Sequence, residues 1–290
     1  MKPIVSVVMT VRNVEKYIAD CLISILDQTF NSFEIVVIDD LSSDSTKNII
    51  LDLNDKRIRY YRNEKWLGLP ISRNRGIRRA RGAYLFFTDG DCAVSKDWIT
   101  KGLEYLKDPS CLAVEGRIIY VSKNYKPTFS DHVMENRNGG NFMTGNMAYK
   151  RTVFENVGCF DEKLSYFEDR DLALRIIKNC NGKIRFNPEM IVYHPRVVLT
   201  PKKYIETAAT IRYRVHLFEK FGEKNFMLWR IFFPTNLIKI LFPPIIFSIL
   251  FVKRFNSSDD FRLLPFIYIY VICQRLHLWR ECAKEKVFLI

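Results

Sequence analysis

Short apolar runs that alternate with helical patterns constrain this chain more than any other feature of its sequence. Four runs of strand length lie in the first ninety residues: Ile4–Thr10, Phe33–Asp39, Ile58–Arg62 and Ala83–Thr88. A segment with helical apolar spacing follows each of them: Glu15–Asp27, Asp44–Leu53, Pro70–Ala80 and Lys96–Lys107. Strands that alternate with helices of this length predict an α/β fold, a mostly parallel sheet covered by helices on both faces.

Polar side chains stand where these apolar runs end. Ligands of such sheets bind outside the carboxyl ends of the strands. The residues that fall at those ends are Thr10, Asp39, Asp40, Asp89 and Asp91. We therefore expect a ligand site at this edge of the sheet.

The second part of the chain continues with weaker patterns. Residues 122–141 are polar and irregular, and a loop of that length usually has a function. A strand is expected at Phe142–Lys150 and a helix at Glu168–Asn179, and two short strands at Lys183–Phe186 and Ile191–Val197.

The tripeptide Asp89-Gly90-Asp91 has two interpretations. It closes an apolar strand, so both carboxylates must project from the strand's end, and such a pair suits a hard divalent cation bound to substrate phosphates. Asp-Gly is also common in turns. His194 also has two interpretations. Its imidazole can complete a metal shell or face a diphosphate, but a lone histidine is more often structural.

Asp39 and Asp40 are a second acidic pair with two interpretations. Either could accept a hydrogen bond from a nucleobase or from ribose hydroxyls. A helix-capping turn explains Ser43 or Asp44 and leaves the two aspartates unaccounted for.

Helical spacing divides the segment that begins at Glu168 into two faces. The predicted buried stripe is Asp169, Leu172, Ala173, Ile176 and Ile177, and the predicted polar face is Glu168, Asp171, Arg175 and Lys178. Asp171 and Arg175 are expected to form a solvated ion pair. Asp169 is the one carboxylate on the buried stripe, which makes it a candidate general base, with a structural cap as the alternative.

The charge balance points to an anionic surface. The chain has 45 basic and 32 acidic residues, and residues 200–290 hold 15 of the former and 7 of the latter. Membrane lipid and nucleic acid both attract such a segment. Seven scattered cysteines without a CxxC motif favour a reducing cytosolic compartment. The run Ile4–Val8 is too short for a signal-peptide core and is expected to be a strand.

Six segments together resemble family 2 glycosyltransferases with a GT-A fold, in that family's order and spacing over roughly residues 4–197. They are SVVMTVRN (6–13), IVVIDDLSSDST (35–46), GLPISRNRGIRRARGAYLFFTDGDC (68–92), TGNMAYKR (144–151), GCFDEKLSYFEDRDLALR (158–175) and VYHPR (192–196). One departure is Leu41, which stands where the family commonly has glycine.

The resemblance implies a role for each candidate residue. Residues that would bind the donor nucleotide are Thr10, Asp39, Asp40, Arg73, Asn74 and Asp89. Asp91 and His194 would hold Mn²⁺ or Mg²⁺, and Gly145, Asn146 and Glu168 would lie on the acceptor side. Asp169 would be the catalytic base of an inverting transfer. The implied donor is a nucleoside-diphosphate sugar, with a UDP-sugar favoured, and the implied acceptor is a glycan or polyprenyl-linked hydroxyl.

The implied organisation is a GT-A, Rossmann-like catalytic domain at residues 1–200 and a basic, apolar helical region at 201–290. Residues 1–121 would bind the nucleotide sugar and 122–200 would form the acceptor side. The apolar stretches Phe226–Val252 and Phe261–Cys273 are broken by prolines or too short to be convincing membrane spans. Their flanking cations and aromatics are typical of interfacial helices on anionic lipid, with a buried helical subdomain or an oligomer interface as alternatives. Attachment of residues 226–280 would place the protein at the cytoplasmic face of the membrane.

Rival functions explain the sequence less well. A sugar-nucleotide pyrophosphorylase needs a glycine-rich loop where this chain has Thr10-Val11-Arg12-Asn13. A nucleic-acid-binding protein leaves the carboxylates at the strand ends without a purpose, so no nucleic acid partner is expected. A non-catalytic scaffold with this fold stays open, although Asp91 and Asp169 argue against it.

Overall fold

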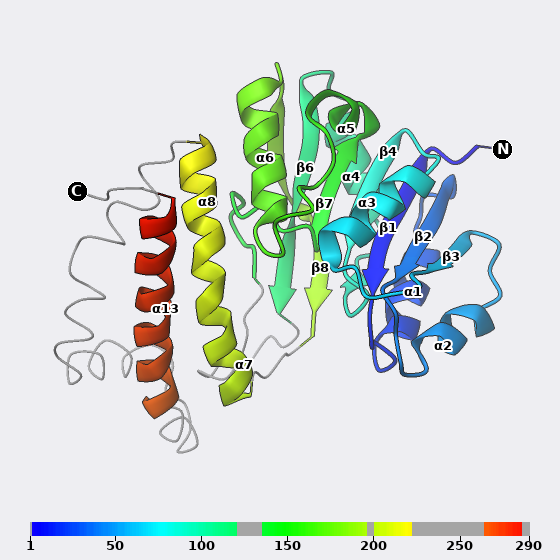
Figure 1. Cartoon of the computed structure of the whole chain (residues 1–290). Helices are drawn as coiled ribbons and strands as arrows, with labels where there is room; N and C mark the ends of the chain where they lie inside the picture. Colours follow the sequence, from blue (N-terminus) through cyan, green and yellow to red (C-terminus); the bar gives the residue numbers. More distant parts are fainter. Residues whose placement is uncertain (1, 121–134, 196–199, 222–263, 286–290) are drawn as a thin grey trace. The chain divides into compact units, whose positions relative to one another are not determined.

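The computed structural model describes residues 2–120, 135–195, 200–221 and 264–285. The described residues divide into two compact units. The first holds the described residues up to Pro195, and the second holds those from Thr200 onward (Figure 1).

The first unit is built on one mixed sheet of eight strands in the order β3-β2-β1-β4-β7-β6-β8-β5 (Figure 1). The strands are β1 (Val5–Val11), β2 (Phe33–Asp39), β3 (Ile58–Arg62), β4 (Tyr84–Thr88), β5 (Ala93–Val94), β6 (Cys111–Tyr120), β7 (Asn146–Lys150) and β8 (Lys183–His194). Strands β3, β2, β1 and β4 are parallel, and so are β6 and β8. Strand β7 runs antiparallel between β4 and β6, and β5 antiparallel on β8. The predicted mostly parallel sheet is confirmed.

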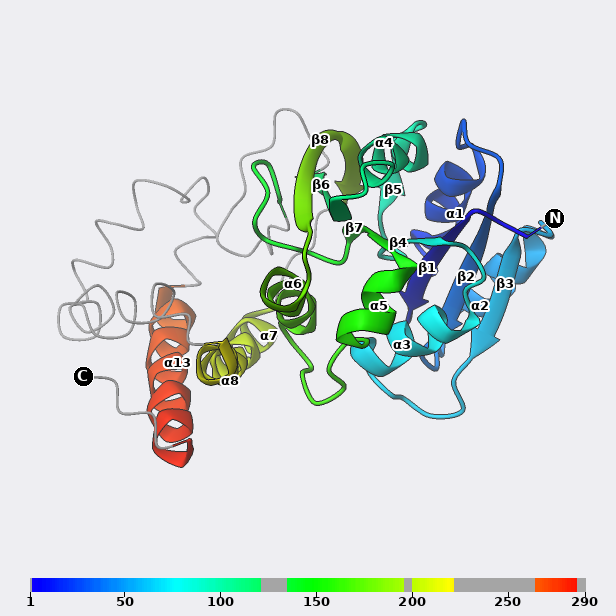
Figure 2. The same cartoon turned by 90° about the horizontal axis from the view of Figure 1, so that it is seen from above.

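Helices cover both faces of this sheet (Figure 2). One face carries α1 (Ile18–Leu26), α2 (Thr46–Asp52) and α4 (Trp98–Leu106), and the other carries α3 (Leu69–Arg79), α5 (Arg151–Val157) and α6 (Glu168–Asn179). The two-residue period of a strand explains the division, because alternate side chains of one strand point to opposite faces.

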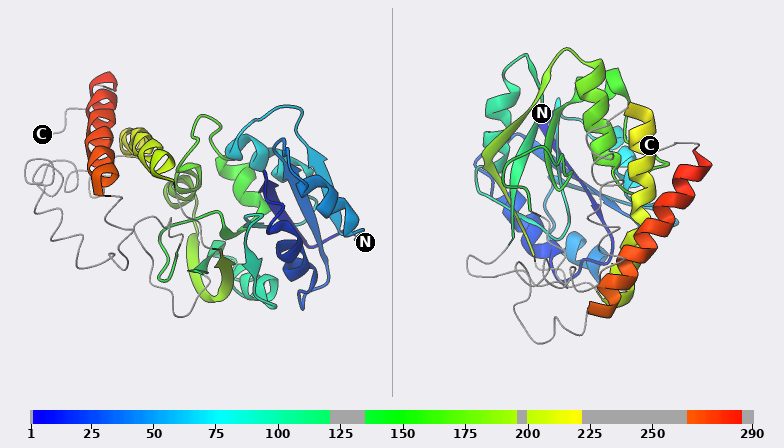
Figure 3. Two further views of the ribbon diagram at one scale, coloured as in Figure 1. Left: turned by 90° about the horizontal axis from the view of Figure 1, so that it is seen from below. Right: turned by 90° about the vertical axis from the view of Figure 1, so that its left-hand side faces the viewer.

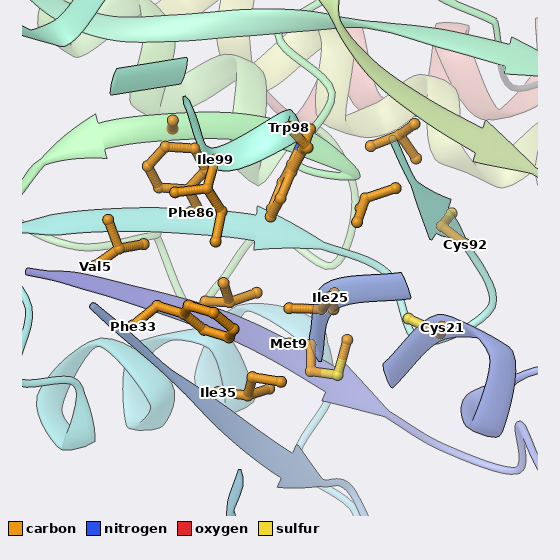
Figure 4. Packing of buried hydrophobic residues seen from close by; sticks show 14 of the residues in the cluster. Val5, Met9, Cys21, Ile25, Phe33, Ile35, Phe86, Cys92, Trp98 and Ile99 are labelled. Carbon is orange, nitrogen blue, oxygen red and sulfur yellow. The ribbon is translucent and has the colours of Figure 1, made fainter. Parts of the chain in front are cut away.

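Alternation along β1 shows how the two cores form. Val5, Val7 and Met9 pack under α1 and α4, whereas Val8 packs under α3. On the α1 side, the rings of Phe86 and Trp98 meet edge to face with centroids 5.1 Å apart (Figure 4). Both cores are closely packed, and they hold the strand ends in fixed positions.

Helix α3 lies against β1 at unusually short range. A Cβ at Gly76 would fall 2.4 Å from Cγ1 of Val8, so a side chain at this position has no room. The close approach sets the distance from the sheet to the α3 residues that reach the strand ends, Arg73 among them.

Some predicted boundaries were wrong. The strand expected from Phe142 begins only at Asn146, because Phe142 has a left-handed φ of 58° that no strand tolerates. The two short strands expected between Lys183 and Val197 are one strand, β8, whose pairing with β6 shifts register between Gly116 and Arg117. Strands β5 and β6 and helix α5 were not predicted.

The second unit consists of helices. They are α7 (Pro201–Glu206), the 3₁₀ turn η1 (Thr207–Thr210), α8 (Ile211–Phe221) and α13 (Leu264–Lys284). Helix α13 contacts α7 and α8 (Figure 3), with Ile211, Val215, Leu278 and Cys282 forming their small core. Among the described helices, none combines the length and the apolar character that crossing a membrane requires. The predicted apolar stretch Phe226–Val252 lies outside the described residues, and the one predicted from Phe261 contributes to a longer helix, α13.

Candidate active site

The carboxyl ends of β1, β2 and β4 meet at one edge of the sheet, because these strands are parallel neighbours. Thr10, Asp39 and Asp89 lie at this edge, on or directly after the last residues of their strands. Asp91 follows in the short connection to β5, and His194 is the last residue of β8.

Asp91 and His194 face each other. Nε2 of His194 lies 4.0 Å from Oδ2 of Asp91. Nδ1 of the same ring lies 2.8 Å from the carbonyl oxygen of Pro195. A carbonyl oxygen can only accept, so this contact requires a proton on Nδ1, and Nε2 is the ring nitrogen that faces Asp91. Burial raises the pKa of Asp91, and the neighbouring charge of Asp89 adds to this effect.

Cys92 joins this pair. A ligand atom from each of Asp91, Cys92 and His194 lies within 4.8 Å of the other two. The separation of 4.0 Å between imidazole and carboxylate is too long for a hydrogen bond and matches two ligands of one cation. These side chains could therefore hold a divalent metal ion.

Arg73 of α3 links residues that are far apart in sequence. Its Nη1 donates to Oε1 of Glu168, and its Nη2 lies 3.5 Å from Oδ1 of Asp89. Its guanidinium also lies over the ring of Phe160, 5.7 Å from the centroid. Burial disfavours the charge, but Glu168, Asp89 and Asp169 outweigh it and raise the pKa of Arg73. Arg73 is therefore a fixed cation among three carboxylates.

Asp169 lies at the start of α6. Its Oδ2 accepts from the backbone N–H of Thr144 at 3.4 Å, and its Oδ1 accepts from the N–H of Arg170 at 2.7 Å. Burial raises the pKa of Asp169 to about 7, with the charge of Glu168 acting in the same direction and Arg73 opposing it. A carboxyl group with a pKa near neutrality is suited to accept a proton at physiological pH.

Phe167, the residue before Glu168 and Asp169, has an uncommon backbone conformation. Phe167 has a φ of 64°, which is costly for a large side chain. Such strain is often found at functional sites, where the surrounding structure maintains it. Here it directs the first turn of α6 toward Arg73 and Thr144.

The predicted faces of α6 were partly wrong. Glu168 and Asp171, expected on the polar face, are buried, while Ile177, expected in the buried stripe, is 55% exposed. The expected pair of Asp171 and Arg175 exists, with Nε 2.7 Å from Oδ2, but it is not solvated. Arg175 also donates to the carbonyls of Val157 and Cys159, which turns this side of the helix inward.

Asp39 and Asp40 are buried and bonded within the loops around them. Asp39 accepts from the hydroxyl of Tyr60 and from the backbone N–H of Ser42. Asp40 accepts from the side-chain amide of Asn63 and from the backbone N–H groups of Leu67 and Gly68. Both carboxylates thus organise the strand-end loops. Leu41 between them has a left-handed φ of 66°, the conformation that glycine adopts freely.

Two asparagines of the predicted site are occupied by structural bonds. The amide of Asn74 binds both backbone groups of Phe160 and the carboxylate of Glu162. The amide of Asn146 accepts from Nε1 of Trp98 and donates to the carbonyls of Arg117 and Met190. The side-chain oxygen of each asparagine accepts one of these bonds and keeps a second lone pair, so the nucleotide contact expected for Asn74 and the acceptor contact expected for Asn146 stay predictions.

Gly145 lies next to the carboxylate of Asp89. A Cβ at this position would fall 2.8 Å from Oδ2 of Asp89, so only glycine leaves Asp89 in place.

Sequence reasoning missed Thr88 and Thr144. Their hydroxyl oxygens, like that of Thr10, are buried with no hydrogen-bond partner among the described residues. Buried polar atoms without partners are rare and call for an explanation, and a ligand is one. The signal for Thr88 was its place immediately before Asp89.

The sequence model described as Glycosyl transferase family 2 matches residues 6–169. TuaG of Bacillus subtilis, named for teichuronic acid biosynthesis, is 37% identical over 112 residues, which are 38% of this chain. The match covers 44% of TuaG, so the chain spans less than half the length of this curated relative.

Solved glycosyltransferases share the fold. S. aureus TarS, crystallised with UDP and also with UDP-GlcNAc, superposes over 100% of this chain and 93% of its own, with a TM-score of 0.59 and 18% identity in the UDP complex. The mannosyltransferase PcManGT from Pyrobaculum calidifontis, in complex with GDP-Man and Mn²⁺, gives a TM-score of 0.59 at 15% identity, over 99% of this chain and 76% of its own. The first unit therefore has a GT-A fold. Since the family's sequence model covers more than half of the residues, this chain belongs to glycosyl transferase family 2.

Proposed function

We propose that this protein is an inverting, metal-dependent glycosyltransferase. It moves a sugar from a nucleoside-diphosphate sugar, in the first instance a UDP-sugar, to a hydroxyl group of an acceptor. The observation that carries the proposal is the position of Asp169 at the start of α6, where its carboxylate accepts from the N–H groups of Thr144 and Arg170 next to the buried pair of Arg73 and Glu168. The UDP and UDP-GlcNAc complexes of TarS, which has the same fold, support the choice of donor.

The side chains at the edge fit a divalent cation. Asp91 offers a carboxylate oxygen and His194 a ring nitrogen whose partner nitrogen is already bonded to a backbone carbonyl. That second bond is the usual way in which proteins orient a metal-binding histidine. We assign Mn²⁺ or Mg²⁺ to these two residues. When bound, the metal supplies positive charge to the diphosphate leaving group.

The donor is assigned to the residues around Asp89. Arg73 holds the Asp89 carboxylate from one side, and Gly145 leaves room for it on the other. The hydroxyls of Thr10 and Thr88, which have no partner among the described residues, lie at the carboxyl ends of β1 and β4, where a nucleotide sugar would contact them. Asp39 and Asp40 act on the same side by fixing the loops that enclose the nucleobase.

The chemical step uses Asp169 as general base. Its carboxylate takes the proton from the acceptor hydroxyl while the oxygen attacks the anomeric carbon of the donor. The bond from that carbon to the diphosphate oxygen breaks, and its electron pair leaves with the nucleoside diphosphate. Attack on the opposite side from the leaving group inverts the configuration. The N–H of Thr144 and the N–H of Arg170 hold the Asp169 carboxylate in place.

The acceptor is assigned to the cell surface. TuaG, to which part of this chain is similar, is named for teichuronic acid biosynthesis, which favours a glycan or a polyprenyl-linked precursor as acceptor. Gly145 and Glu168 lie next to the reacting edge and remain the candidates for its acceptor side.

The second unit is assigned to a membrane surface. Helix α13 exposes Ile269, Leu276 and Trp279, spaced so that they share one side of a helix. Arg280 is exposed beside them. Apolar side chains flanked by cations are typical of interfacial helices, so residues 226–280 are proposed to bind anionic lipid at the cytoplasmic face. Co-sedimentation with anionic vesicles but not with neutral ones would support this assignment. Failure to bind either kind of vesicle would contradict it.

The proposed function is tested by a thermal-shift screen of UDP, GDP, CMP and dTDP, each with Mn²⁺, Mg²⁺ or EDTA. A ligand that binds only the folded chain raises the midpoint of unfolding by mass action. We expect a rise for UDP with Mn²⁺ that EDTA abolishes. No rise with any nucleotide would contradict the proposal and favour a scaffold that keeps the fold without the chemistry.

A further inference from the structure

Trp66 is the most exposed large apolar side chain among the described residues, at 63%. It lies in the connection between β3 and α3, on the edge of the sheet that also holds Asp39 and Asp40. Exposed apolar area is unfavourable in water. An indole exposed at this edge is accessible to a ligand that binds outside the strand ends.

The connection that carries Trp66 is held rigidly. The Asp40 carboxylate accepts from the backbone N–H groups of Leu67 and Gly68, at 2.9 and 2.8 Å. It also accepts from Nδ2 of Asn63 at 2.7 Å, so one buried carboxylate fixes both ends of the connection. An indole on such a support loses little further entropy when it binds a flat ligand.

Arg12 covers one side of the indole. Its guanidinium carbon lies 5.2 Å from the centroid of the Trp66 ring. Arg12 directly follows β1 and is itself exposed. Its loop is tied to the next one, since Asn13 accepts from the N–H of Ser43 at 2.8 Å and donates to the hydroxyl of Ser42 at 3.1 Å. The two planar groups therefore come from two separately anchored loops.

We propose that Trp66 and Arg12 form the stacking surface for the nucleobase of the donor, and thereby contribute to its affinity and selectivity. This inference rests on the proposed function, because it assumes that a nucleotide binds at this edge. Bases stack on aromatic rings and on guanidinium planes, and both are present here as a pair. Neither side chain carries out chemistry; their effect is on donor binding.

Tryptophan fluorescence provides a direct test. The chain has four tryptophans, and Trp279 of α13 is exposed to a similar degree as Trp66, at 54%. The full chain with Mn²⁺ is titrated with UDP, GDP and dTDP, and separately with inorganic pyrophosphate, which has no base. The variants are Trp66→Phe, Trp66→Ala and, as the matched control, Trp279→Phe.

We expect at least one nucleotide to quench the emission of the unsubstituted chain and of Trp279→Phe, and not that of Trp66→Phe. Trp66→Ala should weaken the binding of that nucleotide about tenfold or more and leave the affinity for pyrophosphate unchanged, since stacking acts on the base alone. Arg12→Ala should weaken it less. Because the indole is exposed, the unfolding midpoint of each variant should remain within a few degrees of the unsubstituted chain.

Two outcomes would overturn the inference in different ways. Nucleotide quenching that persists in Trp66→Phe, together with unchanged affinity in Trp66→Ala, would contradict the stacking role and leave the proposed function intact. Calorimetry that detects no nucleotide binding by the unsubstituted chain would contradict the proposed function, and the stacking role with it.

Discussion

Arg73 and Glu168, separated by 94 residues in sequence, form a buried ion pair at the centre of the candidate active site. The same guanidinium lies 3.5 Å from the carboxylate of Asp89, which directly follows β4, so one cation connects the end of this strand with the first turn of α6. Glu168 is the neighbour of Asp169 and repels its negative charge, whereas Arg73 attracts it. The basicity of Asp169 thus depends on a balance between these two residues.

The ion pair predicts a particular pH dependence. The base acts in its deprotonated form, so kcat/KM of the free enzyme should rise with pH through about 7, the pKa of Asp169. Glu168→Gln removes a negative charge beside Asp169 and frees Arg73 to pair with it. Both effects lower the pKa of Asp169, and the acid limb should move to lower pH by on the order of one unit.

Besides Glu168 and Arg73, the hydroxyl of Tyr149 on β7 faces Asp169, and its own pKa is raised by burial and by the Asp169 charge. The Tyr149 hydroxyl therefore remains neutral over the pH range of the assay. Glu155→Gln, on the exposed side of α5, is the matched control and should leave the profile unchanged. An acid limb that stays in place in Glu168→Gln would contradict the account.

Gly145→Ala should impair donor binding with little effect on folding. The added methyl group would meet the end of the flexible Asp89 side chain, which can move aside but then loses its place near Arg73. We expect KM for the donor to rise several-fold and the unfolding midpoint to stay within a few degrees. A large fall in the midpoint with an unaltered KM would show that Gly145 serves packing instead.

Asn146→Ala tests whether this residue is structural. Its loss would leave Nε1 of Trp98 and the carbonyls of Arg117 and Met190 without their bonds in a buried region. Each unsatisfied buried group costs about 1–3 kcal/mol, so the free energy of unfolding should fall by at least ~2 kcal/mol. Urea denaturation measures the difference, with the exposed Asn138→Ala as control. Unchanged stability with lost acceptor binding would contradict the structural role and support the predicted acceptor-side role.

The parallel half of the sheet and the positions of the strand-end aspartates could be predicted from the sequence, because apolar runs and helical spacing are local signals. The pairing of Arg73 with Glu168 could not be, since it depends on how α3 and α6 approach the same strands. Helical spacing also assigned Asp171 and Ile177 to the wrong faces of α6. The spacing gives the period of the helix, but it does not show which side of the helix other elements cover.

The side-chain hydrogen bonds of Asn74 and Asn146 could not be predicted from the sequence either. Both lie in segments that resemble the family, yet their amides bind carbonyls and side chains that come from distant parts of the chain. Likewise, the left-handed backbone at Phe142 shortened the predicted strand, and a non-glycine residue gives no sign of such a conformation.

Asp91→Ala should separate metal-dependent from metal-independent binding. Asp91 offers the carboxylate oxygen that faces His194, so its removal should abolish the increase in nucleotide affinity produced by Mn²⁺. Isothermal titration of the nucleotide with Mn²⁺ and with EDTA provides the comparison. Asp20→Ala, on the exposed face of α1, should retain the full metal effect. A Mn²⁺ effect of normal size in Asp91→Ala would refute the ligand assignment.

The most direct test of the account is the turnover of Asp169→Asn compared with its nucleotide affinity. The amide cannot take the acceptor proton, but it keeps the size of the side chain, and its single oxygen can still accept from one of the two N–H groups that bind Asp169, those of Thr144 and Arg170. We expect nucleotide release from the donor in the presence of acceptor to fall by about 10²–10⁴-fold, the usual contribution of a general base, with the nucleotide Kd almost unchanged. Substantial retained turnover at unchanged Kd would contradict the assignment of Asp169 as the base.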